Sequence, residues 1–338
     1  MDLNYITCGD CVTKLKELPD NSIDLVVTSP PYDDLRSYKN NLDKVKGEYN
    51  GYSFPFEQIA TELYRVMKKG GTVVWVVGDA VIKGSETGSS FRQALFFKEV
   101  GFNIHDTMIY EKNGSSFPAR RTGNRYSQIF EYMFVFTKGK PKTAKLICDK
   151  KNKWSGWTTF GKTGTMRTKA GTLVERVQKP VPEFSPRNNK WKYNTGKNYS
   201  TKDNIAFEHP AIFPELLAED HIITWSEVGD VVLDPFVGSG TTTKMAHINK
   251  RKWIGIDISQ EYCDIAKERM KIAEALVQEG YKREVVVSDR STITSDGKLS
   301  HKEISSMKKK DMVDMMLKWQ DELQKLKNEK KQNGGTHE

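Results

Sequence analysis

Residues 231–242 read VVLDPFVGSGTT, a short apolar strand that runs into a glycine-containing turn. The strand ends at Asp234, and a helix is expected to begin near Thr241. Gly238 and Gly240 would let the backbone approach a ligand closely, and the start of the following helix offers free N–H groups. The stretch therefore predicts a strand-turn-helix unit that binds a ligand through its backbone.

A second apolar run, Trp253 to Ile256, ends in Asp257, about twenty residues after Asp234. A carboxylate at the end of the second strand is where nucleotide-binding sheets hold ribose hydroxyls. The two strands together predict a site for a nucleoside cofactor. A Rossmann-like turn for any such cofactor fits this pattern, so the pattern does not choose among them.

Several short apolar runs have the length and β-branched content of buried parallel strands. They are residues 3–7, 23–28, 72–77, 104–110, 130–136, 231–233 and 253–256. Helical patterns lie between many of them, at Val12 to Leu18, Phe56 to Met67, Phe91 to Val100 and Tyr262 to Val277. This order predicts an α/β fold with a seven-stranded, mostly parallel, Rossmann-like sheet.

A different motif follows the strand at residues 23–28, where the chain reads Thr28-Ser29-Pro30-Pro31-Tyr32. Two successive prolines remove two N–H donors and favour an extended, stiff corner. The exocyclic amine of cytosine or adenine is a poor nucleophile, because its lone pair is delocalised into the ring. The hydroxyl of Ser29 and the carbonyl of Pro30 could accept its hydrogens, and Tyr32 could stack on a base swung out of a duplex. Standing alone, the motif would equally describe a proline-rich turn with a core tyrosine.

The positive charge is concentrated in one third of the chain. The net charge is +9, yet residues 112–205 hold 21 lysines and arginines against 5 acidic residues, which makes this segment +16 and the rest about −7. Nucleic acid is the natural partner of such a segment. A solvated basic loop is the alternative, but aromatic residues interleave with the charges, which favours nucleic acid. These aromatics are Trp154, Trp157, Phe160, Trp191, Tyr193 and Tyr199.

Bulk properties place few further limits on the protein. No run of apolar residues is long enough to span a bilayer, and the first residues lack a secretory signal, so we expect a cytoplasmic protein without a membrane partner. The four cysteines are too scattered for a disulfide framework. Cys8 and Cys11 form a C-x-x-C pair, but no second pair accompanies it, and we expect no metal site.

Together, the motifs resemble those of the beta group of DNA amino-methyltransferases of bacteria and phages. That family has a [DNS]-P-P-[YF] catalytic motif, followed by a target-recognition region and then by a [DP]-x-F-x-G-x-G cofactor motif. The resemblance covers residues 3–110 and 209–271, about half of the chain. It implies a circularly permuted methyltransferase fold, S-adenosyl-L-methionine as the cofactor, and double-stranded DNA as the partner in a bacterial or phage-infected cell.

The resemblance also assigns domains and site residues. It implies a catalytic half at residues 1–112, an inserted basic target-recognition region at 113–205 and a cofactor-binding half at 206–280. The sequence itself predicts a linker and a charged C-terminal helix at 281–338, because a 4-3-4-3 spacing relates Met312, Met316, Trp319, Leu323 and Leu326. Ser29, Pro30, Pro31 and Tyr32 would be catalytic. The implied cofactor-binding residues are Asp10, Phe213, Pro214, Asp234, Pro235, Phe236, Gly238, Ser239, Gly240, Thr241 and Asp257. Of these, Asp10 would lie near the adenine, and Phe213 and Pro214 would border the methionine moiety.

In this family the Ser-Pro-Pro form is associated mainly with the N4 amine of cytosine and the Asp-Pro-Pro form with the N6 amine of adenine. Ser29 therefore favours cytosine N4, with direct in-line methyl transfer to a flipped base. Adenine N6 stays open, as do an inactive DNA-binding homologue and an RNA methyltransferase. The resemblance also leaves open a homodimer and a cognate restriction endonuclease of a restriction-modification system.

Overall fold

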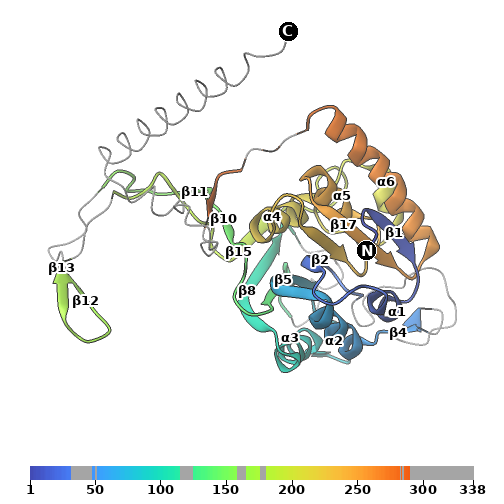
Figure 1. The fold of residues 1–338 in the computed structure, drawn as a ribbon, viewed down its shortest axis with the longest axis horizontal. Coiled ribbons are helices and arrows are strands. Elements are labelled where there is room, and N and C mark those ends of the chain that lie inside the picture. The colour runs from blue at the N-terminus through green and yellow to red at the C-terminus, as the bar shows by residue number, and fades with distance from the viewer. Residues whose placement is uncertain are drawn as a thin grey trace, which may run out of the picture. The chain divides into compact units, whose positions relative to one another are not determined.

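Eight strands form one central sheet (Figure 1). In sheet order they are β1 (Tyr5–Cys8), β17 (Lys252–Asp257), β16 (Val231–Asp234), β2 (Ile23–Thr28), β5 (Met67–Val77), β9 (Phe130–Thr137), β8 (Asn103–Lys112) and β15 (Lys190–Tyr193). The structure is a computed structural model. It describes residues 1–31, 48–49, 52–114, 125–157, 165–175, 180–281, 283 and 285–289.

The first five strands of this order run parallel to one another. β9 is antiparallel to both of its neighbours, β5 and β8, whereas β15 is parallel to β8. Because β1, β17, β16, β2 and β5 share one direction, the loops after all five strands leave the sheet at the same edge. Ligands of open α/β sheets bind at this carboxyl edge.

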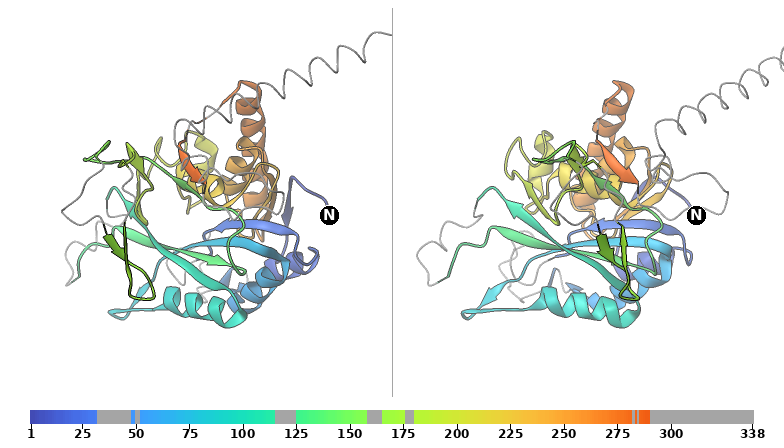
Figure 2. Two further views of the ribbon diagram at one scale, coloured as in Figure 1. Left: turned by 60° about the vertical axis from the view of Figure 1, so that its left-hand side comes forward. Right: turned by 90° about the vertical axis from the view of Figure 1, so that its left-hand side faces the viewer.

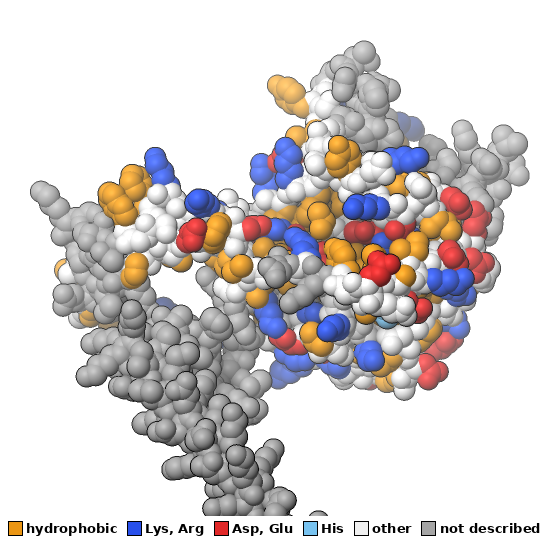
Figure 3. Space-filling view, turned by 90° about the horizontal axis from the view of Figure 1, so that it is seen from above, with side chains coloured by type: hydrophobic (Ala, Val, Ile, Leu, Met, Phe, Trp, Pro, Cys, Tyr) orange, Lys and Arg blue, Asp and Glu red, His pale blue; other side chains and the backbone are white. Residues whose placement is uncertain are grey.

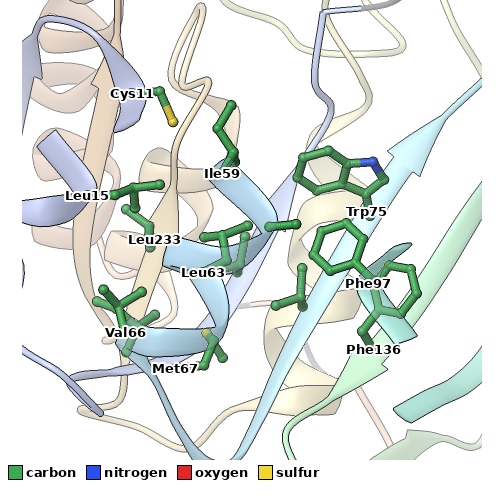
Figure 4. Close-up of a cluster of buried hydrophobic side chains, with 14 of the residues drawn as sticks. Cys11, Leu15, Ile59, Leu63, Val66, Met67, Trp75, Phe97, Phe136 and Leu233 are labelled. Carbon is green, nitrogen blue, oxygen red and sulfur yellow. The ribbon is translucent and has the colours of Figure 1, made fainter. Parts of the chain in front are cut away.

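Helices cover both faces of the sheet (Figures 1 and 2). One face carries α1 (Cys11–Lys16), α2 (Phe56–Val66) and α3 (Ser89–Val100), and the other carries α4 (Glu215–Trp225), α5 (Thr241–Ile248) and α6 (Gln260–Gln278). We call the hydrophobic core between the sheet and α1 to α3 the first core, and the one between the sheet and α4 to α6 the second core. Figure 4 shows part of the first core, where Leu15 and Leu63 from the helices face Trp75 and Leu233 from the strands. Burial of such side chains is the main stabilising contribution to the layered fold.

The remaining elements are short. They are the paired strands β3 (Glu48–Tyr49) and β4 (Tyr52–Ser53), β6 (Val81–Ile82) and β7 (Ser85–Glu86), β10 (Lys145–Ile147) and β18 (Val287–Asp289), β11 (Lys150–Lys151) and β14 (Phe184–Ser185), and β12 (Thr165–Arg167) and β13 (Leu173–Glu175), together with the 3-10 helix η2 (Asn204–Glu208). Five of these eleven elements, β10 to β14, lie within residues 113–205, which also supply β9 and β15 to the central sheet.

All seven predicted strands are present, and the α/β, mostly parallel architecture is confirmed. The predicted number of strands is one too low, because β15 adds an eighth. Trp191 and Tyr193, which the sequence suggested as nucleic-acid contacts, alternate in β15 with two exposed lysines and are themselves buried in the core. Like β15, helix α4 was not predicted. The predicted C-terminal helix lies outside the described residues.

Candidate active site

The two predicted motifs lie side by side, because β2 and β16 are adjacent parallel strands. The Thr28 hydroxyl donates a hydrogen bond to Oδ1 of Asp234 (2.6 Å), although the two residues are 206 positions apart in the chain. The Thr242 hydroxyl likewise donates to the carbonyl oxygen of Val27 (2.9 Å). The diproline corner thus starts next to the glycine turn, as the site hypothesis requires.

The corner itself is partly enclosed. Ser29 and Pro31 are half-buried and Pro30 is buried, directly after the last residue of β2. This position places the corner at the carboxyl edge of the sheet, beside the strand that leads into the glycine turn. Tyr32, the fourth predicted catalytic residue, lies outside the described residues.

The glycine turn has a backbone that other residues would not tolerate. Gly238 and Gly240 have φ values of 48° and 84°, in the left-handed region. A Cβ on Gly238 would lie 2.9 Å from Nε2 of His209, and one on Gly240 would lie 2.9 Å from Cβ of Ala266. Both glycines are therefore required by close packing as well as by φ.

Asp234 joins the turn to the strand. Besides the bond from Thr28, its Oδ1 accepts a hydrogen bond from the N–H of Phe236 (3.1 Å). Burial raises the pKa of the Asp234 carboxyl to about 6, although these hydrogen bonds act in the opposite direction. Pro235 is buried beside it, and the half-buried ring of Phe236 packs edge-on against Phe54, with ring centroids 5.6 Å apart.

Asp257 and Asp10 lie at the same edge. Oδ2 of Asp257 accepts a hydrogen bond from the N–H of Gly238 (2.9 Å), and its Oδ1 accepts one from the N–H of Ser259 (2.9 Å). Burial raises the pKa of the Asp257 carboxyl. Cys8 is opposite Asp257 in the register of β1 and β17, so Asp10 follows close by, where its carboxylate caps α1 by accepting from the N–H of Thr13 (2.8 Å).

The segment before α4 also approaches the turn. The buried His209 ring contacts Gly238 and packs edge-on against Tyr262, with ring centroids 4.3 Å apart. Further along, Phe213 packs against the second core, and the buried Pro214 precedes the first residue of α4. The chain thus brings four separated segments to one region: the diproline corner, the glycine turn, the end of β17 and the stretch around His209.

A profile of the DNA methylase family, which comprises the N6 and N4 methyltransferases, matches residues 23–268. This chain belongs to that family. It is 60% identical over 257 residues to the orphan methyltransferase M.BamHII of Bacillus amyloliquefaciens, an alignment that covers 76% of this chain and 91% of that protein.

Two solved structures are similar in fold. The PvuII DNA methyltransferase (cytosine-N4-specific) is 21% identical, with a TM-score of 0.56 and coverage of 83% of this chain and 94% of that one. M1.HpyAVI, solved as a complex with S-adenosyl-L-methionine, is 20% identical, with a TM-score of 0.50 and coverage of 79% and 98%. The predicted family and fold are confirmed.

The structure of this DNA methylase also contains functional candidates that sequence reasoning missed. Arg269 of α6 is fully buried, and its Nη1 donates hydrogen bonds to the carbonyl oxygen (2.8 Å) and hydroxyl (3.1 Å) of Ser239 in the glycine turn. Its other nitrogens bind Asp203 (2.9 Å) and Glu215 (2.5 Å). The buried Lys244 contacts the same two carboxylates, each at 2.7 Å. The network therefore pairs two cations with two anions.

One signal in the sequence could have revealed this network. Tyr262, Ala266, Arg269 and Ala273 repeat at helical spacing and are buried, so Arg269 occupies the apolar stripe of α6. An arginine there must be paired, because a buried charge without partners is costly. The sequence could indicate that partners exist, but it could not identify them as residues of the segment 203–215.

Two of the four cysteines, Cys11 and Cys263, are buried thiols. Cys11 lies in the first core, and burial raises its pKa well above the usual value. Burial also raises the pKa of Cys263 to about 12. Cys8 donates to the carbonyl of Ile258 (3.4 Å).

Within the described ranges, no group of three or more His, Cys, Asp or Glu side chains could hold a metal ion. No helix among the described residues is both long and apolar enough to cross a bilayer.

Proposed function

We propose that this chain transfers a methyl group from S-adenosyl-L-methionine to the exocyclic N4 amine of cytosine at specific sites in duplex DNA. The observation that carries the proposal is the hydrogen bond between Thr28 and Asp234, which sets the Ser-Pro-Pro corner beside the glycine turn. Family membership supports amine methylation of DNA, and the serine at position 29 favours cytosine over adenine.

The residues at the glycine turn fit a nucleoside cofactor. Gly238 and Gly240 leave no room for side chains and bring backbone to the surface of the site, while α5 starts directly after the turn. Asp257 and Asp10 supply carboxylates at the ends of β17 and β1, suited to ribose hydroxyls and to the adenine amine. The cofactor, when bound, supplies a methyl group on a sulfonium, which is already an electrophile and needs no metal.

The diproline corner would bind the target base. With the target base swung out of the duplex, the Ser29 hydroxyl and the Pro30 carbonyl would accept hydrogen bonds from the amine and hold its lone pair toward the cofactor side. Tyr32 would stack on the base. The main contribution to the rate is proximity and orientation, because the two reactants are held by adjacent loops of one rigid edge.

Residues 113–205 would recognise the target. Their charge supports this role, since phosphate contacts dominate DNA affinity. Acting alone or as a homodimer, the chain needs no endonuclease for the reaction, and the relative M.BamHII is named an orphan methyltransferase. We place the reaction in the cytoplasm, where DNA and cofactor are both present.

Incubation with labelled S-adenosyl-L-methionine and plasmid DNA, followed by nucleoside analysis, tests the proposal. We expect 4-methylcytosine. Recovery of 6-methyladenine would show that the target is the N6 amine of adenine. Absence of any methylated nucleoside would indicate an inactive DNA-binding homologue. A parallel incubation with structured RNA tests the third alternative, since an RNA methyltransferase would label RNA in preference to duplex DNA.

Replacement of Ser29 by Ala tests the residue roles. Loss of one hydrogen bond to the reacting amine should lower kcat about tenfold to a hundredfold, while cofactor affinity stays near that of the wild type. Ser29→Thr retains the hydroxyl and should keep most of the activity. An equal loss of turnover and cofactor binding in Ser29→Ala would contradict the assigned role.

A further inference from the structure

A short ribbon in the basic segment exposes two tryptophans. β11 and β14 pair antiparallel, and further backbone hydrogen bonds run from Asn152 N–H to Glu183 (2.8 Å) and from Val181 N–H to Trp157 (2.9 Å). We call residues 150–157 the tryptophan turn. The ribbon ties the backbone of the turn to residues 181–185 by hydrogen bonds, so the turn has a defined conformation.

Trp154 and Trp157 lie on the same side of this turn. Their ring centroids are 4.7 Å apart, and the side chains are 45% and 54% exposed. The N–H of Trp157 donates to the carbonyl of Trp154 (3.1 Å), which closes the turn, and Gly156 adopts a left-handed φ of 82°. Two adjacent tryptophans that remain half in solvent form an apolar surface, and such surfaces mark sites of interaction.

The charges around the turn identify the partner. Several basic side chains of residues 112–205 are already neutralised within the protein: Lys112 pairs with Glu131, Lys145 with Glu227, Arg187 with Asp149 and Asp220, and both Lys190 and Lys192 with Glu111. By contrast, Lys150, Lys151 and Lys153 are exposed, and none forms an ion pair with an acidic residue that the structure describes. Their charge is therefore available to a polyanion.

Lysines and tryptophans are also arranged together. The Lys153 ammonium lies 5.1 Å from the centre of the Trp154 ring. Figure 3 shows one face of the molecule, on which basic, acidic and hydrophobic side chains are interspersed. Cations without an acidic partner beside exposed π faces suit phosphates and bases together, whereas a protein or lipid partner would need only one of the two.

We infer that the tryptophan turn is a DNA-contacting element of this methylase. Lys150, Lys151 and Lys153 bind phosphates of the duplex, and Trp154 and Trp157 pack on an exposed base or sugar. The inference deepens the proposed function, because it assumes the same duplex DNA substrate. It locates within the broad basic segment a part that contacts the nucleic acid.

The test is the affinity of a fluorescent duplex for the double variant W154A/W157A. Loss of stacking should weaken binding about tenfold or more, with cofactor affinity and melting temperature unchanged because both side chains are exposed. W154F/W157F keeps the aromatic faces and should bind like the wild type. Double-variant affinity within twofold of the wild type would overturn the inference.

The salt dependence of duplex affinity separates the contribution of the three lysines from that of the two tryptophan rings. K150A/K151A/K153A should reduce the slope of log K against log salt by about 1 to 3. Lys252 provides the control. It is exposed at the first residue of β17, at the end of the strand opposite Asp257, and Lys252→Ala should leave the slope unchanged. If the wild type methylates DNA while these variants bind normally, the inference fails and the proposed function stands. Absence of methylation by the wild type would count against the function alone.

A second inference rests on the buried network of Arg269. The geometry points to Arg269 as a positioning residue for the cofactor: its bond to the Ser239 carbonyl fixes the middle of the glycine turn, and the charge is balanced by Asp203 and Glu215. Burial would raise the pKa of Asp203, but the bonds from Lys244 and Arg269 lower it, which keeps the carboxylate charged. This inference also assumes that the turn binds the cofactor.

Arg269→Lys tests this role because it keeps the charge but cannot reach Ser239, Asp203 and Glu215 at once. We expect S-adenosyl-L-methionine affinity to fall about tenfold while duplex affinity is unchanged. Glu215→Gln disturbs the far side of the network and leaves the Ser239 contact, so it should lower melting temperature similarly with a smaller loss of cofactor affinity. If cofactor affinity instead follows melting temperature equally in both variants, Arg269 is only structural.

Discussion

The Thr28 hydroxyl lies 2.6 Å from Oδ1 of Asp234 and donates a hydrogen bond to it across the neighbouring strands β2 and β16. Thr28 is the last residue before the diproline corner, and Asp234 is the first residue of the cofactor motif. Both are buried. Together with the bond from the Thr242 hydroxyl to the Val27 carbonyl, this contact fixes the relative position of the two loops between which a methyl group would pass.

Thr28→Val should therefore loosen the site while keeping the shape of the side chain. The buried Asp234 carboxyl would lose a donor, at a cost of about 1 to 3 kcal/mol in the free energy of unfolding. Cofactor affinity should fall as well, because the glycine turn follows Asp234 directly. Chemical denaturation and calorimetric titration measure the two effects.

Thr72 provides the control. It is also a buried strand threonine, but its hydroxyl has no hydrogen-bond partner among the described residues. Thr72→Val should therefore be neutral or stabilising. Equal destabilisation by the two substitutions would show that the Thr28 hydroxyl has no special role.

Asp234 predicts a pH dependence of stability. Burial raises its pKa to about 6, above the value of about 3.9 expected in the unfolded chain. The folded state therefore holds the proton more tightly, and the resulting stabilisation is complete below about pH 4 and is lost as the pH rises through 6. Asp234→Asn removes this titration and keeps an oxygen to accept from Thr28 and Phe236.

Relative to the wild type, the Asn variant should gain on the order of 2 kcal/mol in unfolding free energy between pH 4 and pH 7. Denaturant unfolding at several pH values measures the gain. Asp264→Asn, at an exposed position on α6, controls for the general effect of removing a carboxylate. A difference between Asp234→Asn and wild type that is constant with pH would contradict the raised pKa.

The sheet and the two motifs could be predicted because their signals are local. Buried parallel strands such as Ile23–Thr28 read as continuous β-branched runs, and a glycine turn is visible in the sequence itself. Even the meeting of the two motifs follows from one rule, that parallel strands bring their carboxyl ends to one edge.

The missed features depend on partners distant in sequence. Helix α4 has no clear apolar stripe because Glu219 and Asp220 are buried, and they are stabilised by Arg283 and Arg187. In β15 the alternation of lysines with aromatics does indicate a strand, yet the same residues suit a nucleic-acid surface. Only the pairing of β15 with β8 shows that the rings point inward.

Gly240→Ala tests whether the turn is limited by space or only by backbone conformation. Gly240 and Gly229 have nearly the same φ, 84° and 87°, but a Cβ on Gly240 would lie 2.9 Å from Ala266, whereas Gly229 has nothing within 4 Å. Gly229→Ala should cost about 1 to 2 kcal/mol from backbone strain alone. Gly240→Ala should cost about 1 to 3 kcal/mol more, because α5 and α6 must separate, and should weaken cofactor binding. Equal losses in unfolding free energy would mean that the contact between the turn and α6 is loose, and Arg269 would then have no rigid turn to hold.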